Sequence, residues 1–317
     1  MARVVSTVVV VALLAATATA FALTEGLKLQ PSPIRAVQVQ KVFSPVCDCP
    51  TETASIRIRL READVLDVTV VDASRNVVAT VERGVRRPAG WAEFAWDGRD
   101  DAGEVLPEGT YRPRVHLRGE RETIVLPNDM RIDVTPPVVE EWDVRPRVFS
   151  PDGDGRADRI VATYRTSENA RGMLFVGGER RAYAKFARTE DRLPWFGIVD
   201  GEPLPAGLYD LRLAVHDPAG NVSVRTEPIP IRIRYVALGR DRVEVRVGAS
   251  FAIRVSSDAR RVRWRLGGRA GEAEPGTLRL RAPAQKGRYT LVVEANGREA
   301  RAAVFVRAAP AREAEGG

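Results

Sequence analysis

An internal repeat constrains the fold of this chain more than any other feature of its sequence. Phe43-Ser44-Pro45 recurs as Phe149-Ser150-Pro151, and Leu106–Tyr111 recurs as Leu204–Tyr209 in the form Leu-Pro-x-Gly-x-Tyr. A third, more divergent unit has Gly287-Arg288-Tyr289 at the corresponding place. Each unit has the length of a small β-sandwich, so we expect one architecture three times in succession.

Within the units, the hydrophobic pattern has a period of two. Candidate strands alternate apolar and polar residues, and clusters of Gly, Pro, Asp or Asn separate most of them. In the first unit they are Ala54–Leu60, Val65–Val71, Val77–Val81, Trp91–Trp96, Tyr111–Leu117 and Ile124–Val134. We therefore predict an all-β fold of tandem immunoglobulin-like β-sandwich domains preceded by one N-terminal hydrophobic helix.

The N-terminal segment Val4–Leu23 contains no charged residue and follows Arg3. About 20 apolar residues can span a bilayer as a helix. Small residues such as those of Ala18-Thr19-Ala20 also suit a cleavable secretory signal. Two interpretations stay open: the chain is anchored in the cytoplasmic membrane through residues 4–23, or it is secreted after cleavage. Both place the remainder outside the cytoplasm.

The repeats divide the chain into segments. We predict a signal anchor or signal peptide over residues 1–25 and a linker over 26–36. Three Ig-like domains follow over 37–135, 136–235 and 236–307, and a disordered tail over 308–317. Thr135-Pro136-Pro137 marks the first domain boundary, whereas the second has no obvious linker. The tail is rich in Ala, Glu and Gly and has no apolar face, which is typical of disorder.

The charge pattern argues against a nucleic-acid partner. The formal net charge is +7. However, basic residues alternate with apolar ones, as in Arg57-Ile58-Arg59-Leu60, and this is typical of the solvated face of a half-buried strand. No nucleic-acid-binding module is recognisable. We expect a partner among the proteins or polysaccharides of the cell envelope.

The run from Trp96-Asp97-Gly98 to Gly109-Thr110-Tyr111 resembles the Ig-like domain of flagellar hook-capping proteins, which also recurs in bacterial surface proteins. Phe149–Gly155 is similar to the opening of Ig-like repeats in secreted and gliding-associated proteins. His216–Asn221 resembles the turn that closes many bacterial Ig-like repeats. The resemblance implies a sandwich fold used as a spacer or binding module. It does not imply a flagellar role, because sandwiches of this kind serve unrelated systems.

Each Gly-x-Tyr has a structural task in such a fold. The glycine relieves a turn, and the tyrosine begins the next strand with its ring in the core. Its hydroxyl can then donate to a backbone carbonyl upstream, as in the tyrosine corner of Greek-key sandwiches. We expect structural roles for Tyr111, Tyr209 and Tyr289.

An acidic loop in the second unit is the sharpest candidate site. Asp152, Asp154 and Asp158 can converge on one hard cation, and the carbonyl of Arg156 can add an oxygen. Calcium is the expected ion, bound weakly, because it prefers oxygen ligands in flexible loops. The alternative is a turn whose carboxylates accept hydrogen bonds from backbone N–H groups.

The only two cysteines, Cys47 and Cys49, fall in the equivalent loop of the first unit. An exported chain favours a disulfide between them, although the ring is small and its stabilisation slight. Free or intermolecular thiols remain a second interpretation. A metal site is the third and weakest, because two sulfurs fall short of a zinc set.

The sequence contains no recognisable catalytic motif. His116 and His216 are the only histidines, and each lies in a strand-like or turn segment without a paired nucleophile motif. We expect a non-enzymatic extracytoplasmic scaffold or adhesion-type module that presents tandem Ig-like domains to a protein or polysaccharide. The alternative is an accessory cell-wall glycan-binding subunit, which would expose an aromatic platform from among Trp91, Trp96, Trp195 and Trp264.

Overall fold

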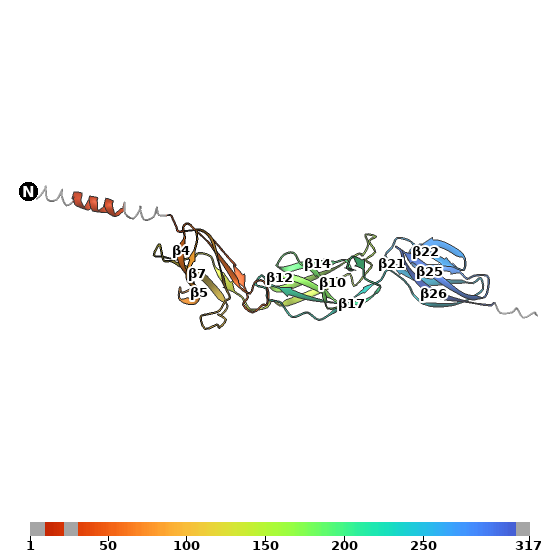
Figure 1. Cartoon of the computed structure of the whole chain (residues 1–317). Coiled ribbons are helices and arrows are strands. Elements are labelled where there is room, and N and C mark those ends of the chain that lie inside the picture. The colour runs from red at the N-terminus through yellow and green to blue at the C-terminus, as the bar shows by residue number, and fades with distance from the viewer. Residues whose placement is uncertain (1–9, 22–30, 309–317) are drawn as a thin grey trace, which may run out of the picture. The chain divides into compact units, whose positions relative to one another are not determined.

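The structure is a computed structural model that describes residues 10–21 and 31–308 (Figure 1). Residues 10–21 are helical, and the other residues of the predicted Val4–Leu23 segment lie outside the described ranges. Among the described residues, no helix is long and apolar enough to span a bilayer. Except for Ala308, the predicted tail also lies outside them. The chain divides into two compact units, residues 1–134 and 135–317.

The first unit is a sandwich of two sheets. One sheet has the order β1-β3-β6, and the other has the order β2-β9-β7-β4-β5 with β8 paired to β7. Its strands are β1 (Ile34–Val39), β2 (Val42–Phe43), β3 (Ala54–Leu60), β4 (Asp64–Val71), β5 (Val77–Arg87), β6 (Gly90–Trp96), β7 (Gly109–Leu117), β8 (Glu122–Val125) and β9 (Met130–Ile132).

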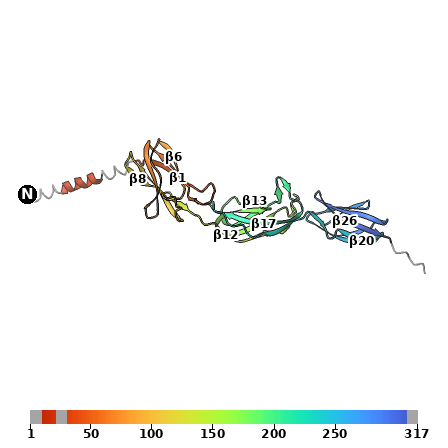
Figure 2. The same ribbon diagram turned by 60° about the horizontal axis from the view of Figure 1, so that its bottom comes forward.

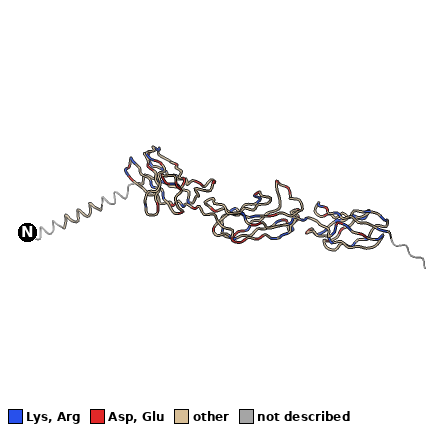
Figure 3. Tube along the Cα trace, turned by 90° about the horizontal axis from the view of Figure 1, so that it is seen from below, with Lys and Arg blue, Asp and Glu red and all other residues tan. Residues whose placement is uncertain are grey.

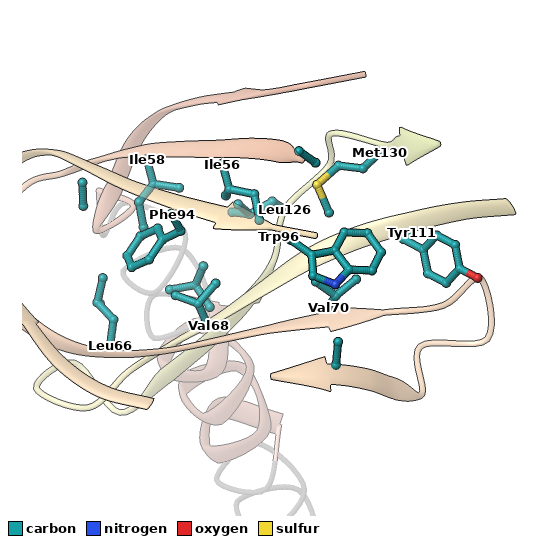
Figure 4. Packing of buried hydrophobic residues seen from close by; sticks show 14 of the residues in the cluster. Ile56, Ile58, Leu66, Val68, Val70, Phe94, Trp96, Tyr111, Leu126 and Met130 are labelled. Carbon is teal, nitrogen blue, oxygen red and sulfur yellow. The ribbon is translucent and has the colours of Figure 1, made fainter. Parts of the chain in front are cut away.

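The core of the first unit forms where the two sheets face each other. Figure 4 shows Ile58 and Phe94 from the first sheet meeting Val68 from the second. Alternate residues of β3 and β4 are buried, so the period of two in the sequence reports the inner faces of the sandwich. The all-β sandwich prediction is confirmed.

Two expectations for the first unit need correction. The segment Ile124–Val134, predicted as one strand, is two strands that pair with different parts of β7. Pro127 lies between them and cannot donate to a sheet ladder, which favours the break. The expected linker over residues 26–36 also ends too late, because Ile34 is buried and already pairs with Leu60.

The second unit contains two hydrophobic clusters. Tyr235 belongs to the first cluster and Val236 packs against the second. The strands around the first cluster are β10 (Val139–Arg145), β11 (Val148–Phe149), β12 (Ile160–Val176), β13 (Glu179–Tyr183), β14 (Arg188–Trp195), β15 (Ile198–Val199), β16 (Glu202–Pro203), β17 (Gly207–His216) and β18 (Ile229–Ile233). The division of the chain into three separate domains stays a prediction.

The long strand β12 takes part in both layers around the first of these clusters. Its first half pairs with β10 and β14, and its second half pairs with β13 and β17. The break between the halves is an irregularity between Arg165 and Ala170. The strand β12 therefore belongs to both hydrogen-bonded layers and connects them. Figure 2 shows β13, β12 and β17 side by side.

The second cluster of this unit lies between sheets of order β19-β21-β24 and β20-β26-β25-β22-β23. The strands are β19 (Val236–Leu238), β20 (Arg242–Arg246), β21 (Ser250–Ser257), β22 (Val262–Leu266), β23 (Arg269–Ala273), β24 (Gly276–Arg281), β25 (Gly287–Ala295) and β26 (Arg298–Arg307). Each of the three clusters is bordered by one parallel strand pair, namely β2–β9, β11–β18 and β20–β26.

The sequence repeat has a direct structural counterpart in the first two clusters. Phe43 and Phe149 are fully buried and pack against Trp96 and Trp195, with ring centroids 5.4 and 5.9 Å apart. Because these aromatic pairs occupy equivalent places beside the parallel strands, the Phe-Ser-Pro motif begins each repeat by anchoring it in the core.

Candidate functional site

The loop after β2 carries the two cysteines. The structure joins Cys47 to Cys49 by a disulfide, with the Cα atoms 5.2 Å apart. The backbone N–H of Cys47 also donates to the carbonyl of Ser44 at 3.3 Å, and Glu52 N–H donates to that of Cys49 at 3.0 Å. The bridge closes a local turn rather than joining distant strands.

The equivalent loop after β11 is acidic, and Asp158 has a structural role in it. Its two carboxylate oxygens accept hydrogen bonds from the backbone N–H groups of Gly153 at 2.8 Å and Gly155 at 2.7 Å. Both glycines have positive φ, near +79° and +83°, so the turn depends on their freedom from a Cβ. Asp158 therefore closes the loop, and it does not join the cation ligand set in which we expected it.

Two other acids of the loop meet an aspartate from a different part of the second unit. Asp152 and Asp154 lie with Asp258, which follows β21, so that one carboxylate oxygen from each is within 4.8 Å of the others. Two oxygens that bind one calcium ion lie up to about 5 Å apart. The three carboxylates can therefore share one ion, and Asp258 takes the place that we expected for Asp158.

Asn296 completes this group, which we call the acidic cluster (Asp152, Asp154, Asp258 and Asn296). Its side-chain amide donates to Oδ2 of Asp152 at 3.1 Å and to Oδ2 of Asp154 at 3.0 Å. Asn296 has φ near +46° in the tight turn between β25 and β26, a conformation that asparagine tolerates. An amide can rotate to present its oxygen instead of its nitrogen, so Asn296 can also serve a cation.

The polar atoms of the acidic cluster are poorly compensated. Both carboxylate oxygens of Asp258 and Oδ1 of Asp152 are buried and have no hydrogen-bond partner among the described residues. Burial raises the pKa of Asp258, and the negative charges of Asp152 and Asp154 add to the rise, which exceeds the opposing effect of the nearby backbone N–H of Asp258 and hydroxyl of Ser150. Ionised carboxylates in this arrangement repel one another, and a bound cation would remove that cost.

Arg156, the fourth expected ligand, partly neutralises the acidic cluster. Its backbone N–H donates to Oδ1 of Asp154 at 2.8 Å, and its guanidinium donates to the backbone carbonyl of Asp258 at 3.2 Å. The guanidinium thus contacts a neutral carbonyl instead of a carboxylate. Its positive charge lies beside the site, so it would weaken the binding of a divalent cation but would not take the place of that cation.

The three tyrosines of the Gly-x-Tyr motifs share one geometry. Each hydroxyl donates to the carbonyl four residues upstream: Tyr111 to Pro107 at 2.8 Å, Tyr209 to Pro205 at 2.9 Å and Tyr289 to Gln285 at 3.1 Å. The hydrogen bond ties the start of β7, β17 or β25 to the loop before it.

The carboxylates beside the Trp96 turn are engaged in backbone hydrogen bonds. Asp97 accepts from Arg99 N–H at 3.1 Å, and Asp100 accepts from the N–H groups of Ala102 and Glu104, both at 2.9 Å. Asp217 similarly accepts from the N–H groups of Gly220 and Asn221 in its own turn. These acids stabilise turns, and His216 contacts the carbonyl of Asp217 rather than its carboxylate.

The tryptophans contribute mainly to the cores. Trp96 and Trp195 are each 3% exposed, and Trp264 packs against the third cluster. Trp91 is 40% exposed and lies beneath the guanidinium of Arg57, 5.1 Å from the ring centroid. The aromatic platform expected for a glycan-binding subunit is therefore reduced, among these four tryptophans, to Trp91.

Basic residues on the strand faces are commonly paired across the sheets. Arg57 lies opposite Glu93 with a contact of 2.6 Å, and Arg263 lies opposite Glu294 with a contact of 2.7 Å. Figure 3 shows basic and acidic residues interspersed along the strands. This arrangement is that of a solvated surface and matches the interpretation of the alternating arginines.

Residues 50–119 match the family model of the FlgD Ig-like domain. The resemblance predicted from the Trp96–Tyr111 run is thereby confirmed for this part of the chain, which is similar to an Ig-type module. No curated protein sequence matches the chain.

Solved structures with low similarity include the three Ig domains I67–I69 of titin, at 8% identity and a TM-score of 0.28, covering 88% of this chain and 100% of that one. A Bacteroides ovatus protein, SGBP-B of the mixed-linkage glucan utilization locus, solved with a heptasaccharide, is 15% identical at a TM-score of 0.24, covering 88% and 70%. The four N-terminal Ig domains of Dscam1 isoform 4.44 are 14% identical at a TM-score of 0.21, covering 86% and 73%.

Proposed function

We propose that this chain is a non-enzymatic, extracytoplasmic scaffold or adhesion-type module that presents Ig-like sandwiches to a protein or polysaccharide of the cell envelope. The observation that carries the proposal is how the polar groups are used. The carboxylates of the Trp96 turn and of the turn after His216 cap turns, as Asp100 and Asp217 do. The apolar faces of the strands are buried in three hydrophobic cores. The exposed strand faces and loops are what remain for recognition.

The disulfide between Cys47 and Cys49 supports the extracytoplasmic part of this proposal. Disulfides persist in oxidising compartments and are rare in the cytosol. The apolar Val4–Leu23 segment, as an anchor or as a cleaved signal, would deliver the sandwiches there.

The proposal includes a calcium ion at the acidic cluster. The observation behind it is the pair of buried carboxylate oxygens of Asp258, which have no partner among the described residues and lie with Asp152 and Asp154. An ion there would hold the loop after β11 to the turns after β21 and β25, and so stiffen the second unit. We expect weak binding, with a dissociation constant on the order of 10⁻⁴ to 10⁻³ M.

The test is saturable binding of the labelled full chain to envelopes isolated from its native cells. We expect the chain to bind these envelopes and to lose this binding after they are treated either with protease or with polysaccharide hydrolases. The treatment that abolishes binding identifies the class of the partner. Covalent crosslinking before extraction then recovers the partner. Absence of saturable binding, or steady conversion of an envelope component into a product, would refute the scaffold.

A further inference from the structure

A basic and aromatic surface lies on the outer face of β13, β12 and β17. Leu174 and Val176 of β12 point into the core, so the alternate residues Arg171, Met173 and Phe175 point to the opposite face. Tyr183 lies opposite Met173, and His216 lies opposite Arg171. The register of these three strands therefore brings the side chains onto one face; Figure 2 shows the strands themselves side by side.

Tyr183 organises the cations of this surface. The guanidinium carbons of Arg171 and Arg180 lie 5.9 and 5.2 Å from its ring centroid. Arg171 also donates to the tyrosine hydroxyl at 3.4 Å. Cation–π contacts of this kind restrict the arginine side chains and leave their N–H groups available to an anion.

His216 holds the tyrosine in place. Its ring stacks on that of Tyr183 with an angle of 4° between the planes. Nδ1 lies 2.9 Å from the carbonyl of Asp217, so Nδ1 carries a proton and donates. In the neutral ring, Nε2 is then an acceptor for the hydroxyl of Tyr183, which it contacts. The tyrosine is therefore fixed before any ligand arrives.

The surface continues along the loop between β13 and β14. Phe186 is 53% exposed, with Lys185 Nζ 5.2 Å and the guanidinium carbon of Arg188 5.6 Å from its ring centroid. Arg188 pairs with Ala170, the residue before Arg171, so the loop adjoins the Tyr183 group. Exposed aromatic rings and cations thus alternate along this edge of the sheet.

The cations of this surface are not used by carboxylates of the protein. Arg171, Arg180 and Lys185 form no ion pair within the described part of the chain, unlike Arg57 and Arg263 on other strand faces. The nearby Glu179 pairs with Arg181, and Asp217 accepts from the backbone of its own turn. The surface therefore has a local excess of positive charge that lacks an internal counter-ion.

We infer that this face, Arg171, Arg180, Tyr183, Lys185 and Phe186, binds an acidic polysaccharide. The inference rests on the proposed function and names its ligand class. The cations gather at two successive aromatic rings, with Arg171 and Arg180 at Tyr183 and Lys185 at Phe186. A single small anion can meet one of these groups, whereas an extended polymer with a carboxylate on each sugar can meet both. The exposed rings add apolar contact area for sugar faces.

The test measures binding of a size-defined oligogalacturonate to the full chain by titration calorimetry, with a neutral maltooligosaccharide of the same length for comparison. We expect the acidic oligomer alone to bind, and its affinity to fall as salt is added. The triple variant Arg171→Ser, Arg180→Ser, Lys185→Ser should bind about tenfold more weakly, since each exposed charge contact contributes modestly.

A matched control removes the same charge elsewhere in the second unit. The variant Arg254→Ser, Arg269→Ser, Arg279→Ser changes three exposed arginines that form no ion pair within the described residues. It should lose less than about twofold in affinity. Equal losses in the two variants would mean attraction by net charge only and would overturn the inference. Far-ultraviolet circular dichroism and the melting temperature verify that both variants fold.

Two further measurements separate the remaining outcomes. Tyr183→Phe keeps the ring and should retain most of the affinity, whereas Tyr183→Ala should lose it together with the ordered arginines. Polyglutamate is the second probe: binding as tight as that of oligogalacturonate, through the same cations, would reassign the surface to acidic proteins. If the chain binds native envelopes saturably but ignores oligogalacturonate, the proposed function stands and this inference fails.

Discussion

Gly197 lies directly against the ring of Phe149. A Cβ atom at Gly197 would be 2.9 Å from Cε2 of Phe149 and 3.0 Å from Cγ of Pro151. Gly98 has the same relation to Phe43 and Pro45 in the first unit, with a Cβ-to-Cγ distance of 2.6 Å to Pro45. Both glycines have positive φ, near +65° and +74°. The glycine of each repeat is thus required twice, by its backbone and by the close approach of the Phe-x-Pro anchor.

This contact predicts that Gly197→Ala lowers the free energy of unfolding by about 2–4 kcal/mol, because overpacking adds to the backbone cost. Gly201→Ala is the matched control, since Gly201 also has positive φ, near +84°, but no atom within 4 Å of its would-be Cβ. It should cost only about 1–2 kcal/mol. Urea denaturation of the two variants measures the difference. Equal losses of unfolding free energy in the two variants would show that the Phe149 ring moves away from the added Cβ atom without strain.

A buried tyrosine predicts a loss of stability at alkaline pH. Burial raises the pKa of Tyr164 to about 12, and its hydroxyl accepts the N–H of Gly172 at 2.9 Å. The unfolded chain loses this proton near pH 10. The contribution of Tyr164 is therefore complete below pH 10 and declines as the pH rises through about 12. Melting temperatures across this range should decline less steeply for Tyr164→Phe.

At neutral pH, Tyr164→Phe should cost about 1–3 kcal/mol, because the N–H of Gly172 is left buried without its acceptor. Urea denaturation at pH 7 checks this value. If Tyr164→Phe leaves the free energy of unfolding at pH 7 unchanged, and the melting temperature declines with alkaline pH as in the wild type, then water replaces the hydroxyl.

The disulfide should matter little for stability. It joins cysteines only two positions apart, so it removes little entropy from the unfolded chain. We expect Cys47→Ser with Cys49→Ser to cost at most about 1.5 kcal/mol, whereas Phe43→Ala, which empties a core position beside the same loop, should cost about 3–5 kcal/mol. Wild-type chain under reductant should melt like the double serine variant. A cost similar to that of Phe43→Ala would mean that the bridge organises the whole loop.

Calcium should stabilise the second unit. At tenfold the dissociation constant, binding adds about 1.4 kcal/mol to the free energy of unfolding. Asp258→Asn should abolish the calcium-dependent rise in melting temperature, and Asn296→Gly should reduce it while keeping the tight turn. Asp210→Asn, which changes an exposed carboxylate outside the acidic cluster, should leave the rise unchanged. A rise that persists in Asp258→Asn would place the ion elsewhere.

The pH dependence of calcium binding has a defined sign. The pKa of Asp258 is raised by burial and by its acidic neighbours. Without the ion, the folded state holds this proton more tightly, so stability decreases as the pH rises from the ordinary value for aspartate through the raised one. With the ion, the carboxylate must be ionised, so affinity should decrease as the pH falls through the same window. Titration calorimetry at several pH values tests this.

Local pattern predicted much of the fold. Strands such as Ala54–Leu60 were predicted with the bounds they have, because alternation along one strand reports a buried face. The break at Pro127 was missed, since the alternation continues through it while the pairing partner changes. The acidic loop was found from its spacing, but Asp158 does not lie with Asp152 and Asp154, because it satisfies backbone N–H groups.

The sequence by itself determined the repeats, the Phe-Ser-Pro anchors and the tyrosines that close each turn, since each depends on residues close together in the chain. Only the tertiary structure decided that Asp258 and Asn296 join Asp152, and that Arg171 meets Tyr183 and His216. These residues come from separate strands and turns. Their proximity depends on sheet register and on packing within the second unit, which no local pattern specifies.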